Sequence, residues 1–176
     1  PNVPLTLSVK PTVCASSSTE KNIKLDITDP DDNDEFEPGE EVSLVVNTEN
    51  KIDDNERIQV EATLYNLDKD KKVEKQSKTI KIDNNEDEDF TFDFKIPADA
   101  EDDDEFEIFV KAFQKDNEEA NCATDSVSLD LNVPDHKLVI DSFNFAPTTA
   151  ECGDTVYGSI NLRNLGSSDE RATVEV

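Results

Sequence analysis

The residues of this chain best suited to chemistry are carboxylates that cluster in short acidic stretches. The clearest stretch is 29–35, Asp-Pro-Asp-Asp-Asn-Asp-Glu, and 83–89 and 99–105 are weaker examples. Calcium binds six to eight oxygen atoms, and flexible loops rich in Asp and Asn supply them. The pattern is not an EF-hand loop, because Pro30 interrupts it and the Gly and final Glu are out of place. The stretch 29–35 predicts either a solvated acidic turn or a calcium site with the ligands Asp29, Asp31, Asp32, Asn33 and Asp34.

Residues that could carry out catalysis are scarce. The only histidine, His136, lies in the linker after Pro134, where a solvated side chain is expected. The serines cluster in loops, no Gly-x-Ser-x-Gly motif occurs, and four glycines can hardly form a phosphate-binding loop. No Cys/His spacing typical of zinc sites is present. We therefore expect no enzymatic activity and no cofactor other than calcium.

Alternating apolar and polar residues run through most of the chain and predict β-strands. The clearest strand is 88–96, and six others are predicted over 22–28, 41–48, 57–67, 72–82, 104–113 and 125–133. Seven short alternating strands in about 110 residues, separated by acidic turns, predict an all-β, immunoglobulin-like antiparallel sandwich. The predicted core between its two sheets contains Phe90, Phe92, Phe94, Phe106, Ile108, Val110, Leu44 and Val60.

The stretch 37–50 recurs at 151–164, and this repeat divides the chain into modules. An offset of 153 − 39 = 114 residues aligns Gly39 with Gly153 and Asn50 with Asn164 without a gap. A repeat of this length indicates tandem domains rather than a solenoid. We predict a complete sandwich over 12–134 and the first three strands of a second, truncated module over 135–176.

The second module is predicted to leave an apolar face uncovered, because three strands cannot close a sandwich. Its second and third strands are predicted over 155–163 and 171–176. We expect either that the polypeptide continues past Val176 and completes the fold, or that a neighbouring subunit donates strands. Residues 1–11, in which Leu5, Leu7 and Val9 alternate, are predicted to be a strand or linker. They could end a preceding module or act as the donor.

The three cysteines of the chain are Cys14, Cys122 and Cys152. Cys14 precedes the first strand of the complete module, and Cys122 precedes its last strand. Because the first and last strands of such sandwiches commonly lie side by side in parallel, the two thiols would meet at one end. We predict a disulfide between Cys14 and Cys122, the alternative being two unrelated thiols. A disulfide implies an oxidising, extracytoplasmic location, and Cys152 would pair outside this sequence.

The balance of 43 acidic to 17 basic residues gives a net charge of −26. Such a field repels nucleic acid and anionic membranes, and it suits cations or a medium of high salt. No apolar run is long enough to span a bilayer. The expected partners are copies of this chain or other surface proteins, without nucleic acid and without membrane insertion.

Several motifs together resemble a known family. They are the turn Pro38-Gly39-Glu40-Glu41 before an alternating strand, the segment Ile-Pro-Ala-Asp-Ala at 96–100, the strand 106–113 and a cysteine near each end of the module. The chain resembles the CARDB-type adhesion-related immunoglobulin-like domains of archaeal and bacterial surface proteins, and most closely the S-layer proteins of small-genome archaea. This resemblance implies an archaeal, extracellular structural protein of the cell surface.

These observations support three hypotheses about function. The first is a structural segment of an extracellular surface layer or filament, built from tandem modules, whose acidic face takes up divalent cations at contacts. The second is an adhesion or ligand-binding module of a cell-surface protein, which would carry a concave or aromatic site on its loops. The third is a non-catalytic spacer of a secreted enzyme.

Overall fold

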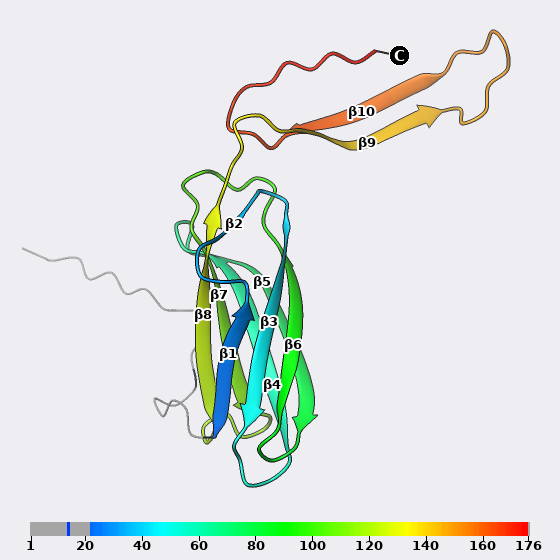
Figure 1. Cartoon of the computed structure of the whole chain (residues 1–176). Helices are drawn as coiled ribbons and strands as arrows, with labels where there is room; N and C mark the ends of the chain where they lie inside the picture. The colour runs from blue at the N-terminus through cyan, green and yellow to red at the C-terminus, as the bar shows by residue number, and fades with distance from the viewer. Residues whose placement is uncertain (1–13, 15–21, 176) are drawn as a thin grey trace, which may run out of the picture.

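The computed structural model describes Cys14 and residues 22–175, and in these residues it contains β-strands and no helix. Strands β1 to β8 build one sandwich, and β9 and β10 form a hairpin that projects from one end of it (Figure 1). The chain is therefore all-β, as predicted. The strand or linker predicted over 1–11, with Leu5, Leu7 and Val9, lies outside the described residues.

The sandwich consists of two facing sheets. The smaller sheet has the order β1-β3-β6, with β1 (Ile23–Asp29), β3 (Glu41–Asn50) and β6 (Asp87–Lys95). The larger sheet has the order β2-β8-β7-β4-β5, with β2 (Asp34–Phe36), β8 (Cys122–Leu131), β7 (Phe106–Gln114), β4 (Glu56–Asn66) and β5 (Lys71–Ile82). All neighbours are antiparallel except β2 and β8, which are parallel. This is an immunoglobulin-like arrangement in which the first strand is split between the sheets.

The core between the sheets follows from the alternation of apolar residues. Phe90, Phe92 and Phe94 of β6 point inward and pair with apolar positions of β3. All eight predicted core residues are at most 2 % exposed, which confirms that prediction. Burial of one such side chain stabilises the fold by about 1.5–3 kcal/mol, so the three phenylalanines of β6 are major contributors.

The hairpin contains β9 (Leu138–Ala146) and β10 (Tyr157–Asn164), which are antiparallel. A third strand was predicted over 171–176, but the described residues of this segment, 171–175, are irregular. Alternating residues form a strand only where a neighbouring strand takes up their backbone hydrogen bonds, and in the described part of the chain this segment has none. The prediction of a third strand was therefore wrong.

The sequence repeat is also a repeat of atomic contacts. Asn50 ends β3 and Asn164 ends β10, and the two side chains make the same pair of hydrogen bonds. The oxygen of each accepts from the backbone N–H two residues later, at 2.9 and 3.0 Å. The amide nitrogen of each donates to the carbonyl four residues later, at 3.0 and 2.7 Å. Gly39 and Gly153 both adopt a positive φ, +83° and +100°, which glycine tolerates without strain. The hairpin is thus built as the counterpart of β1 and β3.

Candidate functional site

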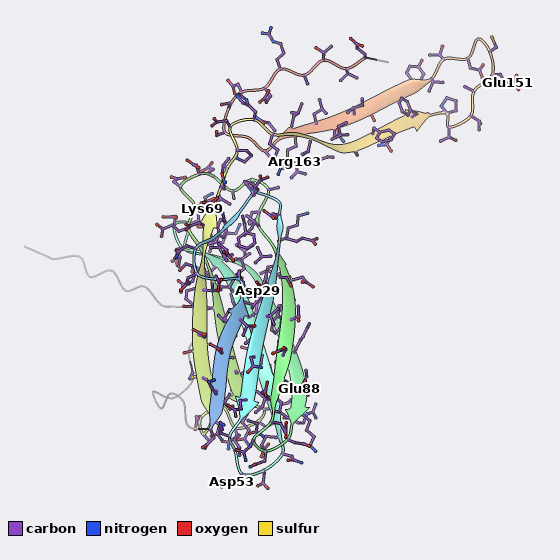
Figure 2. All side chains as sticks on the ribbon, viewed as in Figure 1. Asp29, Asp53, Lys69, Glu88, Glu151 and Arg163 are labelled. Carbon is purple, nitrogen blue, oxygen red and sulfur yellow. A yellow bond between two sulfur atoms is a disulfide. The ribbon has the colours of Figure 1, made fainter. Side chains whose placement is uncertain are left out.

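The acidic stretch 29–35 is the segment by which the first strand crosses from one sheet to the other. β1 ends at Asp29, which Figure 2 labels. The Asp29–Pro30 peptide bond is cis, and β2 begins at Asp34 beside β8. Asn33 has a φ of +66°, a conformation that Asn adopts more readily than most residues. A short strand therefore lies where the sequence predicted only a turn. Three residues are too few to show an alternating pattern.

The carboxylates of this stretch accept hydrogen bonds from backbone N–H groups. Asp32 Oδ1 accepts from the N–H of Ser128 in β8 at 3.0 Å, and Asp34 Oδ2 accepts from the N–H of Asp31 at 3.0 Å. All five predicted ligands are exposed. Among the described residues, no three carboxylate, imidazole or thiol groups gather as they would around a metal ion. The structure places the five residues in one loop without assembling a ligand set, and calcium binding stays a prediction.

A buried carboxylate, Asp104, lies in the loop before β7, within the stretch 99–105. Its Oδ2 accepts from the ammonium of Lys69 at 2.7 Å and from the N–H of Glu101 at 2.9 Å. Lys69 also donates its backbone N–H to the side chain of Asn66 at 2.8 Å. These contacts fasten the turn between β4 and β5 to the loop before β7, at the end of the sandwich where Figure 2 labels Lys69. Sequence reasoning did not distinguish Asp104 from its acidic neighbours, because only burial sets it apart.

The electrostatics of this network favour the charged form of Asp104. Burial opposes ionisation, but hydrogen bonds from Asn66, Lys69 and the Glu101 N–H outweigh burial and hold the pKa of the carboxyl below its usual range. The hydrogen bond to Asp104 raises the pKa of Lys69. Asp104 also borders an open hollow of about 580 Å³, which is lined mainly by acidic residues. The carboxylate of Asp104 is already bound to Lys69 and to the N–H of Glu101. Its role is therefore to hold two loops together, and it is not a free ligand for a metal ion.

The predicted disulfide is present. Cys14 and Cys122 are bonded, with their Cα atoms 5.9 Å apart and a sequence separation of 108 residues. Cys122 begins β8 and is buried, whereas Cys152 is exposed and unpaired in the described part of the chain. The bond closes a loop that contains β1 to β7. Disulfides of this kind form and persist in oxidising environments.

A second contact, not predicted from the sequence, joins the sandwich to the hairpin. Lys137 forms an ion pair with Glu37, and the side chain of Leu165 lies against Gly39. The turn 37–40 of the first module therefore touches the base of the second module, which is the end of the hairpin at Lys137 and Leu165. No motif pointed to this contact, because its partners are about a hundred residues apart and each is an ordinary surface residue type.

The linker between the modules is held by hydrogen bonds to the segment that follows β10. Pro134 and Asp135 accept through their carbonyl oxygens from the N–H groups of Ser167 and Ser168, both at 3.0 Å. The exposed ring of His136 lies with its Nδ1 2.7 Å from a carboxylate oxygen of Glu170. The lone histidine thus belongs to the joint between the modules.

The described residues contain no helix with the length and apolar character needed to cross a membrane. No family model matches the chain, and no curated protein matches it. Among solved structures, a cycloisomaltooligosaccharide glucanotransferase from Paenibacillus sp. is similar with a TM-score of 0.42 and 17 % identity, over 65 % of this chain and 14 % of that one. A β-glucuronidase from Bacteroides uniformis has a TM-score of 0.41 and 9 % identity, over 68 % and 14 %. Red sea bream transglutaminase has a TM-score of 0.41 and 6 % identity, over 85 % and 28 %. The chain thus spans less than a third of each of these proteins, and likenesses at this level say nothing about a shared activity.

Proposed function

We propose that this chain is a non-catalytic structural segment of an extracellular surface-layer or filament protein made of tandem immunoglobulin-like modules. The observation that carries the proposal is a turn that occurs twice and that makes an inter-module contact in its first copy. The turn 37–40 touches the base of the second module, and its counterpart 151–154 is rebuilt at the tip of the hairpin, where it is exposed. A head-to-tail contact of the same kind can therefore be made again by a further module.

The two turns have the same internal hydrogen bonds. Glu37 donates its N–H to the carboxylate of Glu40 at 2.8 Å, and its carbonyl accepts from the N–H of Glu40 at 3.0 Å. In the second turn, Glu151 and Asp154 make both bonds again, at 2.8 and 3.0 Å. Figure 2 shows Glu151 at the tip of the hairpin, far from the sandwich. A surface with fixed geometry at each step is what a linear array of modules requires.

Two further properties support an extracellular structural role. The disulfide suits an oxidising compartment. The net charge of −26 keeps the chain soluble and repels nucleic acid, and it leaves divalent cations as natural bridges between acidic surfaces. The resemblance to archaeal surface-layer proteins agrees with both properties.

Electron microscopy of the purified protein at rising concentration, with calcium and with a chelator, tests this proposal. We expect ordered arrays or filaments with calcium and fewer of them with the chelator. The variant Lys137→Glu, which places like charges beside Glu37, should disorder the assemblies. Lys24→Glu makes the same charge change in β1 on an exposed position away from the joint and should leave them intact. Protein that stays monomeric with and without calcium would refute the proposal.

A further inference from the structure

The hairpin β9–β10 has one polar and one apolar face. On the polar face, Arg163 binds Asp141 through two nitrogens at 2.6 and 2.9 Å, and Asn161 donates to Ser142 Oγ at 3.0 Å. The apolar face is continuous across the two strands, because Ile160 pairs with Phe143 and Leu162 with Ile140. Each of its large side chains is more than a third exposed; they are Leu138, Ile140, Phe143, Phe145, Val156, Ile160 and Leu162. Exposed apolar patches of this kind mark interaction surfaces.

The first module shows how an equivalent hairpin is covered. Val42 and Val46 of β3 stand 114 residues before Val156 and Ile160, and they are 0 % exposed against 44 % and 37 %. Two neighbouring parts of the fold account for the burial of Val42 and Val46 in the first module. The larger sheet covers the apolar face of β3, and β6 pairs along its outer edge. In the described residues, β10 pairs only with β9, so its outer edge is open.

The outer edge of β10 corresponds in sequence, without a gap, to the edge of β3 that pairs with β6. Asn164 fixes the end of β10 with the hydrogen bonds that Asn50 makes at the end of β3. Three inward positions differ: Ile160 replaces Val46, Leu162 replaces Thr48, and Gly158 replaces Leu44. Only the last of these removes an apolar side chain. A Cβ at Gly158 would lie only 2.8 Å from the ring of Phe145, so that ring fills the place of the missing side chain. The apolar face is therefore continuous in both hairpins.

We propose that the outer edge of β10 is a strand-addition site. Its occupant is an antiparallel β-strand of the β6 type, with large apolar side chains at alternate positions, contributed by the same polypeptide C-terminal to the described residues. Backbone hydrogen bonds to the edge supply affinity, and the alternate apolar side chains continue the inner face of the hairpin. In β6 these side chains are Phe90, Phe92 and Phe94, which pair with Val46, Leu44 and Val42.

A second copy of the hairpin fits this surface less well. The face of β3 is covered by a five-stranded sheet together with β6, whereas a second hairpin offers only two strands. In the first module the free edge of β6 is covered, because the side chains of Gln76 and Lys78 of β5 donate to the carbonyls of Asp93 and Thr91. Among the described residues, the outer edge of β10 has no such covering.

Hydrogen exchange of the full chain with a synthetic peptide of residues 85–97, which contain β6, tests the site. The peptide stands in for the added strand because it carries the required alternation. We expect saturating peptide to slow exchange of the β10 backbone amides by about tenfold or more. A peptide with serine in place of its three phenylalanines should give no protection.

Two protein variants at neighbouring positions form a matched pair for this experiment. Ile160→Lys places a charge on the apolar face and should abolish the protection. Ser159→Lys makes a comparable change on the polar face and should retain it, and both positions are exposed, so the hairpin is expected to fold in both. Three results would overturn the inference: no protection by the peptide, equal protection by the serine peptide, or a dimer whose β10 amides are protected without any peptide.

Discussion

Removal of the Cys14–Cys122 disulfide is expected to cost the first module about 4–5 kcal/mol of its free energy of unfolding. The bond closes a loop of 108 residues, and in the chain-entropy model a loop of this length restricts the unfolded chain by about that amount at 25 °C. Domains of this size have a total stability of roughly 5–15 kcal/mol, so the loss is about a quarter or more of the total.

Urea unfolding followed by circular dichroism measures this loss. The variant Cys14→Ala/Cys152→Ala is compared with Cys152→Ala, so that the freed Cys122 has no second thiol to pair with. Cys14 is the better position to change, because Cys122 is buried and its truncation would add a packing loss. Cys152 is exposed, and its replacement alone should stay within about 0.5 kcal/mol of the unchanged chain. A difference below about 1 kcal/mol between the two variants would contradict the reasoning, because the bond would then not restrict the unfolded chain.

Three further changes probe the core, the repeat and the buried carboxylate. Phe92→Ala should cost about 3–5 kcal/mol in urea unfolding, because the ring is 1 % exposed; a loss below about 1 kcal/mol would contradict its place in the core. Asn50→Ala should cost about 1–3 kcal/mol, because buried backbone groups lose their partner, and the exposed counterpart Asn164→Ala should cost less; equal losses would contradict this difference in burial. Asp104 has a lowered pKa, so its charged form stabilises the fold above the unfolded pKa of an Asp, and that contribution is lost as pH falls through the folded value. Asp104→Asn should flatten the acid limb of a stability–pH curve, and an unchanged limb would show that its contacts with Lys69 do not favour the charged form.

The strands of the first module could be predicted because their pattern is local. In β6, Phe90, Phe92 and Phe94 alternate with polar residues, and such a strand can bury only one of its faces. The segment 171–176 also alternates, yet no strand forms over 171–175. A pattern shows which face a strand would bury, but the strand itself needs a neighbour. For β2 the neighbour was β8, and no local pattern revealed it.

The loop 29–35 could be identified from the sequence as unusual, but its role could not. Asp32 is opposite Ser128 because the first strand changes sheets there, and its carboxylate accepts a backbone hydrogen bond of β8. Asp and Asn side chains can bind calcium or accept hydrogen bonds from backbone N–H groups, so composition alone does not separate the two roles. The ion pair of Lys137 with Glu37 was missed for a similar reason, because it depends on how two modules meet.

The position of the disulfide has a mechanical consequence. A force that pulls on the two ends of the chain passes through the bond between Cys14 and Cys122, and β1 to β7 lie in the loop that this bond bypasses. Unfolding of that loop would otherwise release 108 residues, which extend to roughly 360–390 Å. With the bond intact, the Cα atoms of the two cysteines are 5.9 Å apart in the folded module and stay within about 7 Å of each other when the core unfolds. Lengthening is then confined to residues outside the loop, such as those of β8, so under oxidising conditions the module behaves as a tether of nearly fixed length.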